Sequence, residues 1–354
     1  MRKTLFVLIC LLVAIFATSA SAAPTRYQVV ELPIFSASSI NDIGQVTGNY
    51  YQAAIWQSGI GITQLPYGGL GYSWNMACQI NNLGQVAGWS GDGNYTHAVI
   101  WNGTDMIDVG SLGGEEGGGL TCINDYTKVA GFSMNADGFY RAFTWRPGTT
   151  ITELPILRYP FGESYAYDIN EAGQVVGTSN AKAVLWEDDG TPVDLGGLPC
   201  GLLDRSTAYA INDHGQVVGR TEDIDNIRSR AFIRSPGCDL IDLGTLGGTH
   251  ASPTDINNLG QVVGGSDLLN GNFRAFIWES STGMIDLNTL IDTALERPLS
   301  KASAINENGW IVASNSHRSY LLTPVPEPGS MAVLASGLGG LLLLRRNYRR
   351  STKL

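Results

Sequence analysis

The stretch Ile-Asn-Glu-Ala-Gly-Gln-Val-Val-Gly at residues 169–177 decides the fold, because close variants of it occur seven times along the chain. Asn at the first position of a turn can bond its side chain to the backbone two residues on, and Gly at the fourth position adopts a positive φ at little cost. The Val-rich run that follows has the composition of a short β-strand. The stretch therefore predicts a tight turn that leads into a strand.

The seven turns recur with a nearly constant period. Their asparagines are Asn41, Asn81, Asn124, Asn170, Asn212, Asn257 and Asn306, at spacings of 40, 43, 46, 42, 45 and 49 residues. Periods of about 40–50 residues are typical of propeller blades or helical solenoids. Further short apolar runs follow the turns, such as 274–278 and 284–287, and none is long enough for a helix. Each repeat is therefore expected to form four strands, one before the turn and three after it.

The third run of the repeat is apolar at consecutive positions, as in Ala-Val-Leu-Trp at 183–186, which indicates a sheet covered on both faces. The seventh repeat lacks a fourth run, because Pro326 follows soon after its third run at 318–322. A spare β-rich run lies at 27–33, just before the first repeat. We therefore predict an all-β fold, a seven-bladed β-propeller of four-stranded repeats that the N-terminal strand closes without an open sheet edge.

The N-terminal segment has the three parts of a secretory signal peptide. Arg2 and Lys3 precede an apolar run at 5–16, and small residues lead to a predicted cleavage site between Ala22 and Ala23. A membrane anchor is the alternative, but 12 apolar residues are short for a bilayer core of about 30 Å. Residues 1–22 are therefore predicted to be a signal peptide, and the repeat body is expected to occupy 23–324.

The C-terminal segment, residues 325–354, contains Pro326-Glu327-Pro328, then an apolar run at 331–344 and an Arg-rich end. This tail resembles the PEP-CTERM sorting signal. The resemblance implies that signal peptidase and an exosortase-like enzyme process the protein, while the C-terminal hydrophobic helix lies transiently in the inner membrane. It also implies a final place at the cell surface or in the extracellular matrix, in bacteria that often make exopolysaccharide. A permanent anchor is the alternative, although the apolar run of 14 residues is short for one.

The repeats also resemble the HAF family of extracellular repeats, which is named for a His-Ala-Phe motif in the third strand. The corresponding triplets here begin at His97, Arg141, Arg230 and Arg274, and Asp-Leu-Gly-Thr-Leu-Gly-Gly occurs at 242–248. The resemblance covers nearly all of residues 27–322 and departs, for example, at Thr127, which replaces the turn glycine. It implies an extracellular repeat protein and no particular reaction.

Charge and cysteine content limit the possible partners. The formal net charge is −10 and basic residues cluster at both ends, so the body is acidic and nucleic acid is not expected as a partner. Cys10 leaves with the signal peptide, and the absence of a Cys-x-x-Cys spacing argues against a zinc site. Exported proteins can form disulfides. Cys200 and Cys238 flank the strands of the fifth repeat and form the candidate pair, with Cys78 and Cys122 leaving the connectivity open.

No catalytic motif stands out. The chain lacks a Gly-x-Ser-x-Gly elbow, a His-Glu-x-x-His motif and a P-loop, and its acidic loops at 187–190 and 222–226 do not match a calcium loop. His97 and His214 occupy repeat positions, which favours structural roles. We therefore predict no enzyme activity, no metal and no cofactor.

The segments that link one repeat to the next vary most, and two of them are rich in aromatic residues. These residues are Tyr67, Tyr72, Trp74, Tyr159 and Phe161. Aromatic side chains on one face can stack on sugar rings or on a peptide, whereas packing within the loops is the alternative. The leading hypothesis is a non-catalytic envelope or matrix protein that binds glycan or protein through one propeller face. The alternatives are a carbohydrate-active enzyme, which a raised-pKa carboxylate pair in a deep pocket would favour, and a purely structural matrix component.

Overall fold

A computed structural model describes residues 24–67, 73–91, 95–157, 162–199, 205–223 and 228–325 of the chain. Residues 27–325 form one compact unit, which is called the body below. The predicted signal peptide with its Ala22–Ala23 site, and the tail with Pro326, Glu327 and Pro328, lie outside the described residues. Within the described ranges, no helix is both long enough and apolar enough to cross a membrane.

The body is all-β, which confirms the predicted fold class at that level. Its described residues form 28 strands and one 3-10 helix, η1 (Leu287–Thr289). Repeats one to three contain β2 (Ser36–Ile40), β3 (Val46–Tyr50), β4 (Gln52–Gln57), β5 (Gly61–Gln64), β6 (Trp74–Ile80), β7 (Val86–Gly91), β8 (Thr96–Asn102), β9 (Asp105–Gly110), β10 (Gly113–Ile123), β11 (Val129–Asn135), β12 (Tyr140–Trp145) and β13 (Thr152–Glu153). Repeats four to seven contain β14 (Ser164–Ile169), β15 (Val175–Ser179), β16 (Lys182–Trp186), β17 (Pro192–Gly196), β18 (Arg205–Ile211), β19 (Val217–Glu222), β20 (Ser229–Arg234), β21 (Ile241–Gly244), β22 (Ala251–Ile256), β23 (Val262–Asp267), β24 (Phe273–Glu279), β25 (Gly283–Asp286), β26 (Lys301–Ile305), β27 (Ile311–Ser314) and β28 (Ser319–Pro324).

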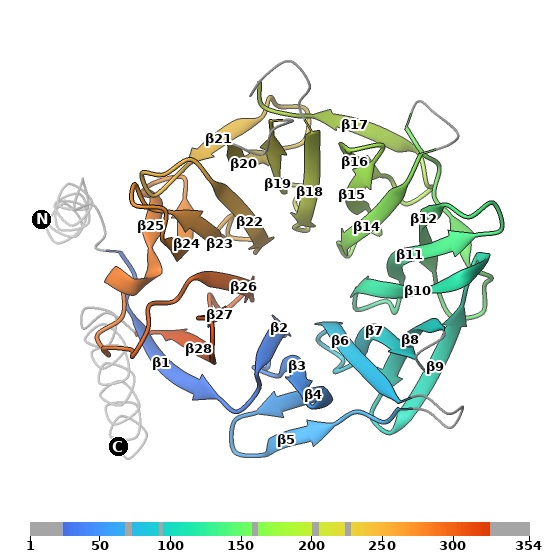
Figure 1. Cartoon of the computed structure of the whole chain (residues 1–354), viewed down its shortest axis with the longest axis horizontal. Helices are drawn as coiled ribbons and strands as arrows, with labels where there is room; N and C mark the ends of the chain where they lie inside the picture. The colour runs from blue at the N-terminus through green and yellow to red at the C-terminus, as the bar shows by residue number, and fades with distance from the viewer. Residues whose placement is uncertain are drawn as a thin grey trace, which may run out of the picture. The chain divides into compact units, whose positions relative to one another are not determined.

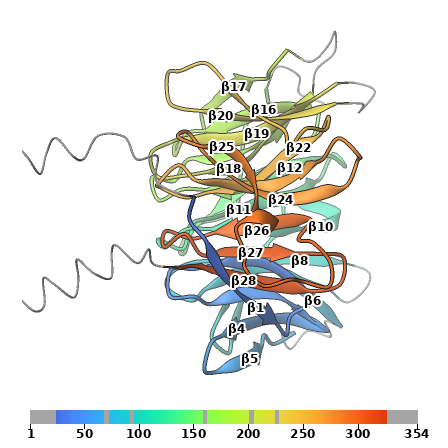
Figure 2. The ribbon, with the colours of Figure 1, turned by 90° about the vertical axis from the view of Figure 1, so that its left-hand side faces the viewer.

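Consecutive strands of a repeat pair in antiparallel fashion, and each turn that begins with Asn joins the first strand to the second. Figure 1 shows the sheets arranged around a common axis, with the first strand of every repeat innermost, and Figure 2 shows the same body from the side. All seven Asn turns therefore lie at one end of the axis, which we call the turn end. Within the described ranges, the loops between second and third strands and the links between repeats lie at the other end, the loop end.

The N-terminal strand β1 (Tyr27–Leu32) completes the last sheet, whose order is β1-β28-β27-β26. Its antiparallel register runs from Tyr27 opposite Pro324 to Leu32 opposite Ser319. Tyr27 and Leu32 are buried, so the strand contributes side chains to the core as well as hydrogen bonds. The first and last segments of the body are thus partners in one sheet, as the missing fourth run predicted.

Repeats two and three depart from the expected separate four-stranded sheets. Strand β10 is 11 residues long, and its early part pairs in parallel with β8, which joins the two repeats into one eight-stranded sheet. The junction places Gly117, at φ +72°, opposite Thr96; a Cβ on Gly117 would lie 1.9 Å from the Thr96 carbonyl oxygen. The close approach needs glycine, which explains why this Gly-rich link extends a strand instead of forming a loop.

The apolar core lies between neighbouring repeats. One cluster joins Ala142 of the third repeat to Val184 and Trp186 of the fourth, and another joins Val312 of the seventh repeat to Ile40 of the first. Each sheet is therefore covered on both faces, which is the reason that its third strand is apolar at consecutive positions.

Candidate functional site

The turn end is held together by the seven turn asparagines, all of which are buried. Each side-chain Nδ2 donates to the main-chain oxygen of the next turn asparagine at 3.0–3.1 Å. The last, Asn306, donates to the carbonyl oxygen of Asn41 at 3.0 Å, so the chain of hydrogen bonds closes on itself. We call it the asparagine ring. The repeated Asn thus has the structural role that its regular recurrence indicated.

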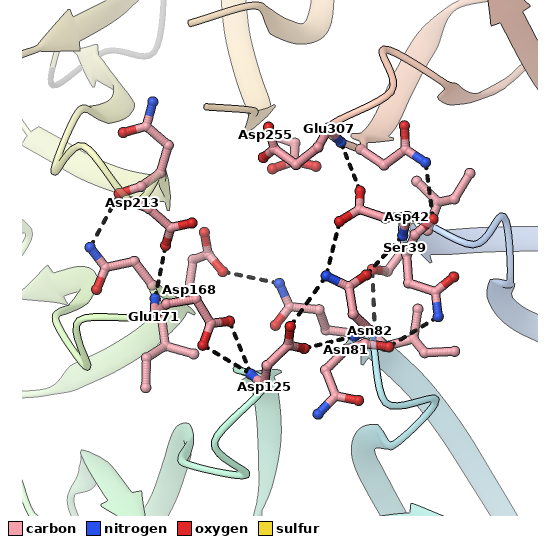
Figure 3. A pocket seen from close by; sticks show the side chains of 18 of the residues that line it. Ser39, Asp42, Asn81, Asn82, Asp125, Asp168, Glu171, Asp213, Asp255 and Glu307 are labelled. Carbon is pink, nitrogen blue, oxygen red and sulfur yellow. Dashed lines mark hydrogen bonds between the residues drawn. The ribbon is translucent and has the colours of Figure 1, made fainter. Parts of the chain in front are cut away.

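The residues that follow these asparagines form a second ring around the opening. They are Asp42, Asn82, Asp125, Glu171, Asp213, Asn258 and Glu307. Each main-chain N–H donates to the side chain of the next member, at shortest distances of 2.8–3.0 Å, and Glu307 N–H closes the ring on Asp42. Figure 3 shows these side chains around a cavity of about 290 Å³. Five carboxyl groups therefore border the turn end of the axis.

Two further carboxyl groups, Asp168 and Asp255, lie deeper in the same cavity and are buried by the innermost strands. Burial raises the pKa of Asp168 to about 6 and that of Asp255 to about 8, and the charge of Asp168 adds to the second shift. Asp168 accepts from Gln79 Nε2 at 3.1 Å and from the Ile211 N–H at 2.9 Å. Asp255 accepts from two backbone N–H groups, one of them Ile305 in the next repeat at 2.8 Å. Every oxygen of the pair is therefore engaged by the scaffold.

The loop end of the axis opens into a larger cavity of about 630 Å³, which we call the tyrosine cavity. Tyr167 and Tyr209 lie on its wall with ring centroids 5.7 Å apart, and the Arg220 guanidinium lies 5.6 Å from the Tyr209 centroid. Burial raises the pKa of both tyrosines, so the phenols stay neutral hydrogen-bond donors. Phe273, Lys301 and several Ser and Thr hydroxyls from repeats one, six and seven complete the wall.

The two cations of the tyrosine cavity differ in their surroundings. Arg220 pairs with Glu222 at 2.5 Å, but its buried Nε–H has no hydrogen-bond partner among the described residues. Lys301 has no acidic group within ion-pair distance in the described part of the chain, and surrounding protein atoms lower its pKa. The wall of the cavity therefore carries a guanidinium that one acid holds and an ammonium group without an acidic partner among the described residues.

An aromatic cluster at the loop end spans repeats two to four, with Trp89 on β7, Phe132 on β11, Tyr140 on β12 and Tyr165 on the inner strand β14. The Phe132 ring lies 6.0 Å from Trp89, 5.8 Å from Tyr140 and 5.4 Å from Tyr165, centroid to centroid. Tyr165 shares strand β14 with Tyr167 of the cavity. All four rings of the cluster are half-buried, so each keeps an accessible edge or face.

These residues recur at three positions of the repeat that the sequence analysis did not single out. Counted from the turn asparagine, Lys301 and Tyr165 lie five residues before it, Tyr167 and Tyr209 lie three before it, and Arg220, Trp89 and Phe132 lie eight after it. The residue types at these positions change from repeat to repeat, for example Trp89, Thr178 and Arg220, although the flanking Val and Gly residues recur. The change of residue type at equivalent strand positions of the repeats was therefore the sequence signal that could have located the tyrosine cavity.

The structure brings together only part of the predicted binding set. Tyr67 and Trp74 meet at Ser90, whose hydroxyl donates to both main-chain oxygens at 3.1 Å, and Trp74 is 39% exposed. Neither residue is part of the tyrosine cavity wall. The other three predicted residues, Tyr72, Tyr159 and Phe161, lie outside the described residues. The predicted aromatic face therefore stays a prediction.

The cysteines have different environments. Cys238 is exposed, but Cys200 lies outside the described residues, so their disulfide stays a prediction. Cys78 and Cys122 are free thiols on neighbouring inner strands, and burial raises the pKa of Cys78 to about 12. Among the described residues, no group of three or more His, Cys, Asp or Glu side chains is arranged to hold a metal ion.

Residues 324–350 match the PEP-CTERM protein-sorting motif. The match marks the chain as an exported protein whose C-terminal segment is processed at the membrane by an exosortase-type enzyme, which confirms this part of the sequence prediction. No curated protein sequence matches the chain.

Solved structures resemble the body at low sequence identity. A streptogramin B lyase matches with a TM-score of 0.58 and 10% identity, over 85% of this chain and 98% of the lyase. An oligogalacturonate lyase in complex with manganese matches with a TM-score of 0.53 and 13% identity, over 86% and 95%. The BP39L lectin from Burkholderia pseudomallei matches with a TM-score of only 0.43 and 10% identity, over 85% and 98%. The likenesses to the two lyases identify the fold as propeller-like and say nothing of activity.

Proposed function

We propose that this exported protein is a seven-bladed β-propeller that binds a glycan in the tyrosine cavity without cleaving it. The blade count is supported by the seven turns of the asparagine ring and by the pairing of β1 with β28. The Asp-Leu-Gly-Thr-Leu-Gly-Gly run at 242–248 supports repeats of the HAF type. After processing of its tail, the protein would act at the cell surface or in the extracellular matrix.

The wall of the tyrosine cavity is the observation that carries the proposal. Tyr167 and Tyr209 offer ring faces for the apolar side of a sugar, and the hydroxyls of Ser252 and Ser303 offer donors and acceptors for its polar edge. A volume of about 630 Å³ falls within the range of about 300–1,000 Å³ that small-ligand sites occupy. The aromatic cluster beside the cavity provides further stacking surface for a longer chain.

A carbohydrate-active enzyme is the second candidate, because Asp168 and Asp255 are a raised-pKa carboxyl pair in one cavity. Glycosidases need one such acid and one free carboxylate to act on the sugar. Here the oxygens of both groups accept hydrogen bonds from the scaffold, which supports a structural role for the pair. Glycan binding is therefore assigned to the tyrosine cavity at the loop end, and Asp168 and Asp255 are assigned a structural role.

One titration tests the proposal against the enzyme. The mature protein, purified in detergent, is titrated with cellohexaose by calorimetry while the release of reducing ends from the same sugar is followed. We expect binding without release. Tyr209→Ala should weaken binding about tenfold, since a stacking contact with an aromatic ring contributes about 1–1.5 kcal/mol. Tyr126→Ala, an exposed tyrosine at the turn end, is the matched control and should bind like the wild type. Sugar release would overturn the proposal in favour of the enzyme, and equal binding by Tyr209→Ala would remove the cavity from it.

A further inference from the structure

We infer that the tyrosine cavity selects a saccharide that carries a carboxylate, held between Arg220 and Lys301. The inference rests on the proposed glycan binding and adds the chemical class of the ligand. Arg220 lies on the fifth repeat and Lys301 on the seventh, so the two cations face the same cavity from different parts of its wall.

The charge of this cavity is opposite to that of the rest of the body. The formal net charge of the chain is −10, and five carboxyl groups border the turn end. The tyrosine cavity instead contains Arg220 and Lys301, and the acid that pairs with either of them among the described residues is Glu222. Two cations and one acid leave one net positive charge. A carboxylate, with its single negative charge, matches this balance better than a doubly charged phosphate.

Arg220 has the geometry to receive the carboxylate. Its Nε–H is buried and unpartnered in the described structure, while a terminal nitrogen is held by Glu222 and the guanidinium lies near the Tyr209 ring. The side chain is 32% exposed although its Nε is not, so a carboxylate entering the cavity meets the exposed part of the guanidinium. The fixed guanidinium plane favours a planar acceptor such as a carboxylate.

Lys301 supplies the second contact without competition from an acid. It begins the inner strand β26, where its backbone partner Ser314 lies on β27, so its main chain is fixed by the sheet. Desolvation lowers the pKa of the ammonium group, and a neighbouring carboxylate compensates for that loss of hydration. The hydroxyls of Ser252 and Ser303 on the same wall are available to the sugar hydroxyls.

A matched pair of sugars tests the inference. The mature protein in detergent is titrated with the β-1,4-linked hexamer of glucuronate and with cellohexaose, which differ only in the carboxylate groups. We expect the glucuronate hexamer to bind at least about tenfold more tightly at low salt, and this preference to shrink as the ionic strength rises. Arg220→Gln and Lys301→Met should each reduce the preference for the glucuronate hexamer over cellohexaose about three- to tenfold. Arg234→Gln is the matched control, since this half-buried arginine bonds the Cys238 carbonyl oxygen and is not part of the cavity wall.

Each outcome decides between the two proposals. If both hexamers bind the wild type equally, or if the preference survives in both variants, the carboxylate inference is overturned while glycan binding stands. If neither hexamer binds the wild type, both proposals fail. Arg220→Lys keeps the charge but removes the planar guanidinium, so a full preference in this variant would overturn the role of the guanidinium plane. Circular dichroism verifies that each variant is folded, and the salt dependence of the wild type tests the charge contribution without any substitution.

Discussion

Asp168 and Asp255 show how a single buried side chain connects two repeats. Each is positioned at a β-bulge of an inner strand, and each accepts the backbone N–H of the following repeat. Burial raises the pKa of Asp255 to about 8, and Asp168 and Glu307 add repulsion. The folded body therefore favours the protonated form of Asp255.

The raised pKa of Asp255 predicts how stability depends on pH. A group with a folded-state pKa above its unfolded value contributes stability that is fully present below pH about 4 and is lost as the pH rises through about 8. Asp255→Asn cannot ionise, so its free energy of unfolding, relative to that of the wild type, should rise steadily between those pH values. Urea denaturation at a series of pH values measures the difference. A constant difference would show that Asp255 is not buried as described; Asp137→Asn, a substitution at an exposed turn position, is the control and should leave the pH profile of the wild type unchanged.

At the scale of the element, the turn and the strand that follows it were predictable from the sequence, because Asn and Gly have strong backbone preferences. Thr127, which replaces the turn glycine in the third repeat, adopts the same positive φ of 60° and bonds Gln85 at 2.9 Å. The inner strand was harder to predict. Its bulge, between Ala166 and Asp168 for example, breaks the alternation that assigns side chains to faces. For this reason the sequence did not indicate that Tyr167 faces the tyrosine cavity, and the predicted binding residues were those of the irregular links between repeats.

The asparagine ring predicts a large effect from one small substitution. Asn212→Ala removes two donated hydrogen bonds, to the carbonyl oxygen of Asn257 and to Gln216 Oε1, and leaves the Gln216 N–H unbonded. Because these groups are buried or half-buried, the free energy of unfolding should fall by about 2–4 kcal/mol in urea denaturation. Glu171→Gln keeps an acceptor for the Asp125 N–H and should stay within about 0.5 kcal/mol of the wild type. Equal effects of the two substitutions would contradict a structural asparagine ring.

At the scale of the whole molecule, the two ends of the central axis differ in charge, with carboxyl groups at the turn end and cations with aromatic rings at the loop end. The number of Asn turns and the partner of the N-terminal strand were predictable from the sequence, since both follow from what each repeat contains or lacks. The sequence did not predict the parallel junction of repeats two and three or the difference between the ends. Both depend on which side chains and backbones approach each other across repeats.

Strand β1 should be essential to the body. Deleting residues 24–32 removes the buried side chains of Tyr27 and Leu32 and leaves the outer edge of β28 without a partner. We expect a lower melting temperature and self-association through the open edge, as measured by thermal unfolding and light scattering after gel filtration. Val30→Thr changes an exposed position of the same strand and should alter neither property. A monomeric deletion variant that melts like the wild type would show that β1 is dispensable.

The partnership of Tyr27 with Pro324 also sets an order of events during secretion. An exported chain that crosses the membrane N-terminus first presents β1 long before its partner β28 arrives. Pairing between segments so distant in the sequence is slow, and here it has to wait until almost the whole body has crossed. The sorting motif begins at residue 324, where the last strand ends. Because the tail follows that strand directly, release from the membrane before β1 and β28 have paired would free a protein with an unpaired edge.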